Sequence, residues 1–413
     1  MKTLFVNPNN RNPMGDLAAV EPPLWLSLMA SHYLEDGKQV TVLDAEADNL
    51  TEAQTLAAIL ESPADEVILV VMGNNPSVSS TPKFPVAHAL WQAAKGHKKT
   101  YLTGIHPMAA PSPLYDVLAW HPTKCLSLHW ELLPMDKYRA HNWHCLDGSA
   151  RSPYASIYTS LGCAFDCYYC NIHTLYKGRE MLFRNPTNVI QEVDTLVYKY
   201  GIRNIKIWDE LFALKESRVV QLCQGFRPYD LNIWAYARVD TVTEKMLHAM
   251  VEGGVKWLAY GFENASASVR EQSGKAFTES KMAKAIKWTR EVGINIMGNF
   301  TFGLPGETEA TARASLDFAK SQLFEFVNFY VALPYPGSRW WAQTKGEVEW
   351  SDFDQYGQNK SPWFAFRDKA FKEYFSNPAY REMVKQRFGD PGLSEIKKML
   401  SYKRAGESNA KHK

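Results

Sequence analysis

The stretch Ser160-Leu-Gly-Cys-Ala-Phe-Asp-Cys-Tyr-Tyr-Cys170 determines how the rest of the chain is interpreted. It spaces Cys163, Cys167 and Cys170 as C-x3-C-x2-C, and closing so short a loop around one metal centre costs little chain entropy. A zinc site usually has four ligands, and no fourth partner stands at a zinc-like spacing. On a four-iron cluster, three thiolates leave one iron open to a small molecule. The stretch therefore favours an iron–sulfur site over a zinc loop or three cysteines that only pack in a core.

The same spacing, with the aromatic Tyr169 before the last cysteine, resembles the hallmark of the radical S-adenosylmethionine (radical SAM) enzymes. The resemblance implies that Cys163, Cys167 and Cys170 hold a [4Fe–4S] cluster whose open iron chelates the amino and carboxylate groups of S-adenosylmethionine (SAM). It also implies an external electron donor of the flavodoxin or ferredoxin type. An electron from this donor would cleave SAM to a 5′-deoxyadenosyl radical, which removes hydrogen from an unactivated carbon.

The composition is typical of a globular protein and excludes several classes of partner. At 413 residues, with 46% hydrophobic and 22% charged residues, the chain is long enough for two or three domains. A formal net charge of +2 indicates neither nucleic acid nor an anionic membrane as a partner. No apolar run approaches the ~18–20 residues of a membrane span. Six cysteines, three of them in one loop, argue against a disulfide framework and predict a reducing, cytoplasmic location.

Residues 1–130 alternate strand and helix patterns, which predicts an α/β fold with a doubly wound, Rossmann-like parallel sheet. The expected strands cover residues 3–7, 39–43, 66–72 and 99–102, and the expected helices cover residues 22–34, 51–61 and 84–95. Ligands of such sheets bind at the carboxyl ends of the strands. Five small or polar residues follow those ends, namely Ser77, Ser79, Ser80, Gly104 and His106.

These strand ends resemble the N-terminal cobalamin-binding domain of one large class of radical SAM proteins. Gly104 would let the backbone approach a bulky ligand, and the serines would offer hydroxyl groups. The Asp-x-His-x-x-Gly motif of methionine-synthase-like domains, which supplies a cobalt-ligating histidine, is absent, so cobalamin would bind without a protein histidine. His106 is the one substitute, although a loop histidine more often forms hydrogen bonds. A Rossmann-like domain that binds nothing is the alternative.

Residues 131–150 connect the two expected domains and are rich in polar and aromatic side chains. Their His141, His144 and Cys145 include the residue types that bind metals. The cofactors already implied leave no need for another metal. We therefore expect these three side chains to pack at the domain junction.

Residues 151–345 repeat a strand followed by an amphipathic helix, a pattern that predicts a partial (β/α)6 barrel. The expected strands cover residues 155–159, 204–208, 232–239, 257–262, 294–302 and 326–333. Barrel chemistry gathers at the carboxyl ends of the strands. The residues that follow each strand are therefore the candidates for cofactor binding.

Charged residues and glycines follow these strands, and the radical SAM resemblance implies a role in SAM binding for each. Asp209 and Glu210 would accept hydrogen bonds from the SAM ammonium. Arg238 would pair with the methionyl carboxylate, and Glu263 would accept bonds from the ribose hydroxyls. Gly303 would let the backbone approach the adenine. Each residue taken alone could equally form a structural turn or salt bridge, so their recurrence at successive strand ends is the argument.

Residues 346–413 depart from the barrel pattern and predict a helical extension that ends in a disordered tail. One helix is expected to carry Trp363, Phe364, Phe366, Phe371 and Phe375, and Pro391-Gly392 is expected to break the chain before the next helix. This extension would cap the barrel and shape the substrate pocket.

The resemblances together imply a cobalamin-dependent radical SAM C-methyltransferase that acts on a small-molecule or peptide substrate. Two alternatives remain open at this point. The chain could catalyse a non-methylating radical reaction such as cyclisation, ring contraction or oxidation, because the shared residues bind cofactors and not substrate. It could also be a non-catalytic iron–sulfur protein, although a redox sensor needs no contacts to ribose or methionine.

Overall fold

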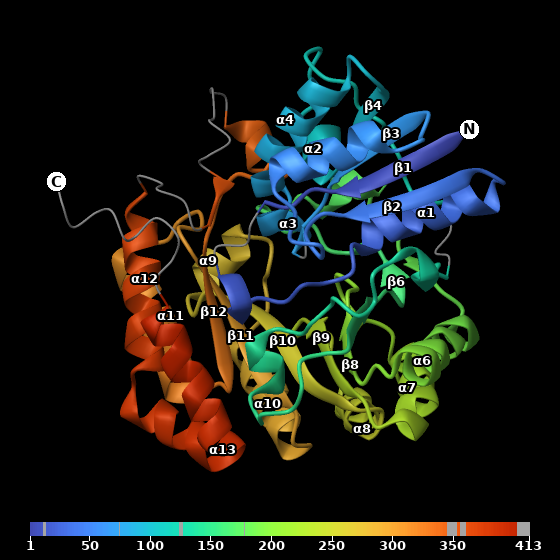
Figure 1. Ribbon diagram of the computed structural model, residues 1–413. Helices are drawn as coiled ribbons and strands as arrows, with labels where there is room; N and C mark the ends of the chain where they lie inside the picture. The colour runs from blue at the N-terminus through green and yellow to red at the C-terminus, as the bar shows by residue number, and fades with distance from the viewer. Residues whose placement is uncertain are drawn as a thin grey trace.

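The computed structural model describes residues 1–10, 14–73, 75–123, 127–176, 178–344, 353–355 and 361–402. An N-terminal lobe, coloured blue in Figure 1, lies over a barrel coloured green to orange. Two C-terminal helices, coloured red, run along one side of the barrel (Figure 1). This arrangement agrees with the α/β fold class expected from the sequence.

A four-stranded parallel sheet forms the N-terminal lobe. Its strands are β1 (Lys2–Asn7), β2 (Gln39–Asp44), β3 (Glu66–Val71) and β4 (Lys99–Gly104), in the order β2-β1-β3-β4. All six residues of β3 are buried, as expected of an inner parallel strand that is covered on both faces. The four strands predicted for this region are confirmed.

Helices cover both faces of this sheet. Helix α1 (Leu24–Glu35) packs on one face, whereas α4 (Phe84–Ala94) packs on the other together with Ile59 of α2 (Glu52–Glu61). The first eight residues of α1 are all buried, because α1 belongs to a hydrophobic core that continues into the barrel. A helix that is apolar all round is buried on all sides. Helix α1 therefore joins the two lobes.

A six-stranded parallel sheet forms the barrel. Its strands follow the order β5-β8-β9-β10-β11-β12, and β5 and β12 are its unpaired edges, so the barrel is partial. Their bounds are β5 (Tyr154–Ile157), β8 (Asn204–Ile207), β9 (Asn232–Ala237), β10 (Val255–Glu263), β11 (Asn295–Phe302) and β12 (Phe326–Val331). All six predicted strands are confirmed.

Amphipathic helices follow the barrel strands, as their sequence periodicity predicted. They are α6 (Pro186–Tyr200), α7 (Glu216–Phe226), α8 (Glu244–Glu252), α9 (Ala267–Gln272), α10 (Glu279–Glu291) and α11 (Glu309–Gln322). Shorter elements were not predicted, because two to five residues are too few to show a periodicity. They include β6 (Ser160–Leu161), β7 (Leu182–Phe183), α3 (Pro76–Ser79), α5 (Ile105–Ala109) and the 3-10 turns η1 (Gly15–Leu17), η4 (Asn142–Cys145) and η5 (Ile172–Leu175).

The connector closes the barrel at the amino-terminal ends of its strands. Trp143 in η4 packs edge-on against Trp234 of β9 and Trp257 of β10, with ring centroids 5.0 and 5.4 Å away. The neighbouring His144 is buried, and its Nε2 lies 3.0 Å from the Asn232 carbonyl oxygen. Cys145 is buried as well. His144 and Cys145 pack as expected, but among the described residues their contacts are with the amino-terminal ends of the barrel strands and not with the other lobe.

Two helices form the C-terminal extension, α12 (Pro362–Phe375) and α13 (Pro378–Ser401). Helix α12 packs against β12 and α11. The break in the second helix lies at Gly389, whose φ is 68°, and not at the predicted Pro391-Gly392. Proline fits the first turn of a helix, so Pro391 begins the second half of α13 and does not end the first. The predicted disordered tail falls within residues 403–413, outside the described residues.

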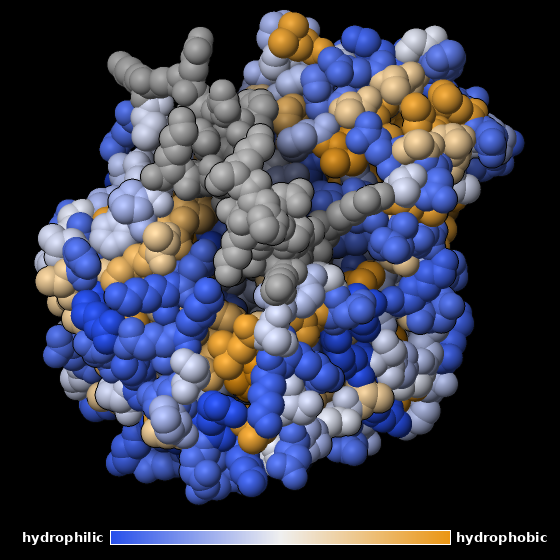
Figure 2. Space-filling model, turned by 60° about the vertical axis from the view of Figure 1, so that its left-hand side comes forward, coloured by the Kyte–Doolittle hydropathy of each residue, from blue (hydrophilic) through white to orange (hydrophobic). Residues whose placement is uncertain are grey.

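Hydrophilic side chains cover most of the described surface seen in Figure 2, and apolar residues gather there in smaller groups. Within the described ranges, no helix combines the length and the apolar character needed to cross a membrane.

Candidate active site

The three-cysteine loop leaves and returns to the barrel through the short β6–β7 hairpin, in which Ser160 pairs with Phe183 and Leu161 with Leu182. Gly162 begins the loop with a φ of 93°, and a Cβ there would lie 2.3 Å from the Glu180 carbonyl oxygen. Only glycine fits this turn. The hairpin therefore holds both ends of the loop at the carboxyl end of β5.

The three cysteines of the loop form no disulfide in the described part of the chain, and all three are partly exposed. Burial raises the pKa of Cys163 to about 12, so its thiolate needs a positive partner. In the described part of the chain, no group of three His, Cys, Asp or Glu side chains could hold a metal ion. An iron–sulfur cluster needs its ligands in a different arrangement from a single metal ion. Its three thiolates bind three separate irons, so they lie farther apart than ligands around one ion. An all-sulfur donor set on one short loop fits such a cluster.

Asp209 follows β8 and holds the first residues of the loop. Its two oxygens accept hydrogen bonds of 2.6 Å from the Thr159 amide, the Thr159 hydroxyl and the Ser160 hydroxyl. Its side chain is buried. The predicted position at the end of a strand is correct, but the structure directs this carboxylate to the stem of the loop.

Glu210 lies next to the loop and is less buried than Asp209. It accepts a hydrogen bond of 3.1 Å from the Gly162 amide and one of 2.9 Å from the Tyr176 hydroxyl. Removal from water raises the pKa of its carboxyl to about 8. A cationic ligand beside Glu210 would offset that cost and favour the carboxylate.

Arg238 follows β9 and contacts the loop directly. Its guanidinium carbon lies 3.8 Å from the ring centroid of Phe165, and its Nη1 lies 3.9 Å from the Cys167 sulfur. Asp240 accepts two hydrogen bonds of 2.9 Å from the same guanidinium. These two hydrogen bonds hold the positively charged guanidinium of Arg238 in a fixed position beside the cysteines.

Glu263 ends β10 in a left-handed backbone conformation, with a φ of 63°. Its carboxylate pairs with Lys275 and accepts a hydrogen bond of 2.7 Å from the Thr301 hydroxyl. Burial and the nearby Glu263 charge raise the pKa of Tyr169 well above its usual range. Glu263 thus lies beneath the aromatic residue of the cysteine loop. A strained backbone at a buried carboxylate is typical of functional sites.

Gly303 follows β11 with a φ of 86°, which favours glycine. A Cβ there would lie 2.7 Å from the Trp363 ring of α12. The Gly303 amide donates a hydrogen bond of 2.5 Å to Glu307. The sequence predicted that adenine would approach the backbone at Gly303. In the structure, the Trp363 ring lies close to this backbone.

In the N-terminal lobe, the predicted residues close the loop after β3. The Ser80 hydroxyl accepts a hydrogen bond of 3.0 Å from the Gly73 amide, and the Ser79 hydroxyl bonds the amide and carbonyl of Asn75 at 2.8 and 2.7 Å. A Cβ on Gly104 would lie 2.4 Å from the Val71 carbonyl oxygen, so close strand packing requires this glycine. Ser77 lies in α3, but its side chain is outside the described part of the structure.

His106 is fully buried in the N-terminal lobe. Its ring lies 4.1 Å from that of Phe84, and its Nδ1 lies 3.4 Å from the Thr81 hydroxyl. Burial lowers the pKa of His106 to about 3, so the ring is neutral. The structure places His106, a residue of α5, in packing contacts. This agrees with the absence of a cobalt-ligand motif in the sequence.

A buried polar network lies at the ends of β1 and β2, and none of its residues was among the candidate site residues named from the sequence. The Lys83 ammonium contacts Asn7 at 2.9 Å and Glu46 at 2.6 Å, and Asn7 donates a hydrogen bond of 2.7 Å to Asp44. Lys83 comes from η2 (Thr81–Lys83), far from the other residues in sequence. The polar pair Asp44 and Glu46 after a strand was the only sequence signal.

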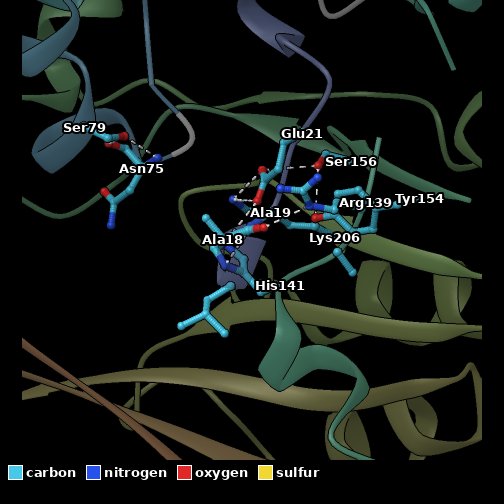
Figure 3. Close-up of polar contacts among 12 residues, drawn as sticks. Ala18, Ala19, Glu21, Asn75, Ser79, Arg139, His141, Tyr154, Ser156 and Lys206 are labelled. Atoms are coloured by element: carbon cyan, nitrogen blue, oxygen red, sulfur yellow. Dashed lines mark hydrogen bonds and ion pairs between the residues drawn. The ribbon is translucent and has the colours of Figure 1, made fainter. Parts of the chain in front are cut away.

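A cavity of about 860 Å³ lies between the lobes. One part of its wall comes from strand ends of the N-terminal lobe, and another comes from the barrel interior and the C-terminal helices. The lining residues from the lobe include Gly73, Asn75, Ser79 and Lys83, and those from the barrel include Lys206, Trp234, Tyr236, Asn328 and Tyr330. Figure 3 shows Asn75 and Ser79 on one side and Lys206 and His141 on the other. The cavity is large enough for a substantial ligand shared by both lobes.

Residues 157–319 match the model of the radical SAM superfamily. A relative called an uncharacterized methyltransferase, from Pyrococcus horikoshii, is 29% identical over 395 residues. That alignment covers 83% of this chain and 82% of the relative. The matched region contains the three cysteines together with Asp209, Glu210, Arg238, Glu263 and Gly303, whereas most of β5 and all of β12 lie outside it.

Two solved structures share the fold. The radical SAM methyltransferase TsrM from Kitasatospora setae, with cobalamin and a [4Fe-4S] cluster bound, matches with a TM-score of 0.62, 17% identity, and coverage of 82% of this chain and 73% of its own. The cobalamin-dependent radical SAM enzyme OxsB, with aqua-cobalamin and SAM bound, matches with a TM-score of 0.63, 12% identity, and coverage of 96% and 72%. The chain therefore contains a radical SAM domain and has the two-lobed fold of cobalamin-dependent radical SAM enzymes.

Proposed function

We propose that this protein is a cobalamin-dependent radical SAM enzyme that methylates an unactivated carbon of a small-molecule or peptide substrate. One observation carries the proposal. The cavity of about 860 Å³ joins the strand ends of the N-terminal lobe to the interior of the same barrel that holds the three-cysteine loop. A ligand of the N-terminal lobe would thus face a substrate in the barrel.

The SAM site in this proposal surrounds the cysteine loop. Glu210 would accept hydrogen bonds from the SAM ammonium, Arg238 would pair with its carboxylate, and Glu263 would hold the ribose hydroxyls together with its partner Lys275. Asp209 keeps the loop in position through Thr159 and Ser160. The adenine would lie along the backbone near Gly303, against the wall that Trp363 forms.

The cobalamin site in this proposal is the N-terminal wall of the cavity. Ser79 lies on that wall, with Gly73, Asn75 and Lys83 beside it. Ser77, Ser80 and Gly104 belong to the same strand ends. His106 is packed against Phe84 and Thr81, which supports cobalamin binding without an imidazole ligand from this residue.

The similar proteins support the same activity. The first relative is called a methyltransferase, TsrM is a methyltransferase solved with cobalamin, and another TsrM structure contains a tryptophan substrate and a SAM analogue. An external donor such as a flavodoxin or ferredoxin would supply electrons. Cluster thiolates must remain reduced, so we place the protein in the cytoplasm.

When bound, the cluster, SAM and cobalamin supply the radical and the methyl group, whereas the chain binds and orients them. Arg238 and Glu210 would fix the two ends of the methionyl group beside the loop. Trp143 and its aromatic neighbours close the far end of the barrel and exclude water from it. Exclusion of water protects a reactive intermediate from side reactions.

Anaerobic incubation of the reconstituted protein with SAM and a chemical reductant tests the radical activity. We expect 5′-deoxyadenosine from the wild-type protein and none from Cys163→Ala, because only the cluster delivers the electron. A cluster-loaded wild-type protein that forms no 5′-deoxyadenosine would be a non-catalytic iron–sulfur protein.

A further inference from the structure

Lys206 occupies an unusual place for a lysine, in the middle of a barrel strand. Its neighbours Ile205 and Ile207 are fully buried in the hydrophobic core, and Lys206 is itself only 1% exposed while lining the cavity. Taking an ammonium out of water is energetically costly, so an apolar residue of similar volume would often be as stable or more stable there. The position therefore indicates a role beyond packing.

The charge of Lys206 is balanced by Glu21, which reaches the barrel from the segment between η1 and α1. The Lys206 ammonium lies 2.9 and 3.2 Å from the two carboxylate oxygens of Glu21. Ser156 of β5 donates a hydrogen bond of 3.4 Å to Glu21, and His141 Nε2 lies 3.7 Å from it (Figure 3). Burial raises the pKa of Glu21 and lowers that of Lys206. The ammonium and the carboxylate form a buried ion pair without net charge.

Aromatic rings surround the same ammonium. Its nitrogen lies 4.8 Å from the ring centroid of Trp234, 5.4 Å from that of Trp208 and 5.8 Å from that of Tyr236. Trp234 and Tyr236 also line the cavity. Flat apolar surfaces thus flank a hydrogen-bond donor at the barrel end of the cavity.

We propose that Lys206 is a substrate-recognition residue that donates a hydrogen bond to an uncharged acceptor on the substrate, such as a carbonyl, amide or ring nitrogen. Trp234 and Tyr236 hold the flat, apolar body of that substrate, and Glu21 sets the preference for a neutral group. The inference rests on the proposed function, because it takes the barrel end of the cavity as the substrate site.

The preference follows from the charges. A substrate carboxylate at Lys206 would lie beside the Glu21 carboxylate, and two like charges in a buried site repel strongly. A neutral acceptor gains a hydrogen bond from the ammonium without that repulsion. Specificity of this kind depends on rejecting the wrong group as much as on binding the right one.

Benzamide and benzoate are matched probes, since they share a flat ring and differ in charge. Dissociation constants for both are measured by ligand-observed NMR on the anaerobic holoenzyme. The wild-type protein should bind benzamide at least about tenfold more tightly than benzoate. Lys206→Met should weaken benzamide binding by about ten- to a hundredfold, the effect of losing a hydrogen bond to a charged group. Lys256→Met is the control; it replaces an exposed lysine in β10 of the same sheet and should change neither constant.

Glu21→Gln is the decisive variant. Without the Glu21 charge, the Lys206 cation should prefer benzoate, so the order of the two affinities should reverse. Glutamine has the size of glutamate, so this variant carries the test if Lys206→Met fails to fold. Tighter benzoate than benzamide binding by the wild type, binding of neither probe, or an unchanged order in a folded Glu21→Gln would overturn the inference.

The same samples separate this inference from the proposed function. Their bound cobalamin and their yield of 5′-deoxyadenosine report on the cofactors alone. Normal cofactor results with the wrong probe selectivity contradict only the role of Lys206. Correct selectivity in a protein that neither binds cobalamin nor forms 5′-deoxyadenosine contradicts only the proposed function.

Discussion

At the scale of single residues, the proposal assigns the cluster to the three cysteines of the loop, whereas Cys145 and Cys223 pack in the hydrophobic core. Cys163→Ala, Cys167→Ala and Cys170→Ala should each abolish the cluster, because each removes one of only three thiolates. Cys145 and Cys223 are buried, and burial raises the pKa of both thiols, so Cys145→Ala and Cys223→Ala should retain it. Iron and sulfide analysis after anaerobic reconstitution measures this. Retention in the first set with loss in the second would refute the assignment.

The adjacent carboxylates Asp209 and Glu210 should respond differently to substitution. Asp209→Asn weakens the three hydrogen bonds that hold Thr159 and Ser160, so we expect a lower melting temperature and less bound iron. Glu210→Gln should retain the cluster and weaken SAM binding by about ten- to a hundredfold, since it loses a charge-assisted hydrogen bond.

Iron content, melting temperature and the SAM dissociation constant of both variants separate the two roles. Tighter or unchanged SAM binding by a cluster-loaded Glu210→Gln protein would show that another residue holds the ammonium. An Asp209→Asn protein with normal iron and normal stability would show that the loop does not depend on this carboxylate.

At the scale of secondary-structure elements, the strand ends of the N-terminal lobe should bind cobalamin without His106. This histidine is buried against Phe84 at the start of α4. The Co(II) form of the bound cofactor should show no nitrogen superhyperfine splitting from His106 in electron paramagnetic resonance, and His106→Ala should give the same spectrum. A splitting that disappears in His106→Ala would establish His106 as the axial ligand.

The η4 turn should make folding sensitive to acid through His144. Burial lowers the pKa of His144 to about 3, whereas an unfolded histidine titrates near 6.5. Between these values only the unfolded state binds the proton, so stability is complete above pH 6.5 and falls as the pH falls. The loss should reach about 2 kcal/mol between pH 7 and pH 5. Urea unfolding at both pH values should show this loss in the wild type and a smaller one in His144→Gln. Equal losses would contradict it.

The regular elements were predictable from the sequence, and the short ones were not. All ten strands of the two parallel sheets follow from apolar runs bounded by turn residues. The β6–β7 hairpin could not be predicted, because its two-residue strands are too short to show a periodicity. The break in α13 was predicted near Pro391, but the left-handed conformation of Gly389 forms it.

The same contrast holds for the candidate site. The positions of Glu210, Arg238 and Glu263 after barrel strands follow from counting elements along the chain. The partners that define their roles come from distant segments, as with Tyr176 for Glu210 and Lys275 for Glu263. Such pairs depend on tertiary packing and leave no pattern in a single sequence.

At the scale of the whole molecule, the site depends on how the two lobes meet. The first eight residues of helix α1 are buried between the N-terminal sheet and the barrel, and Glu21 just before the helix enters the barrel to pair with Lys206. The sequence indicated two domains, but it gave no sign that one domain places a carboxylate inside the other. The cavity between the lobes is the consequence of that contact.

In the proposed function, the protein holds cobalamin between its lobes and uses it to carry a methyl group from SAM. The direct test is anaerobic incubation of the cobalamin-loaded holoenzyme with a low-potential reductant and SAM whose methyl group is deuterated. Mass spectrometry of the protein-bound cobalamin then follows the label. The account predicts cobalamin that carries the trideuterated methyl group. A protein that binds no cobalamin, or bound cobalamin that acquires no labelled methyl group, would contradict it.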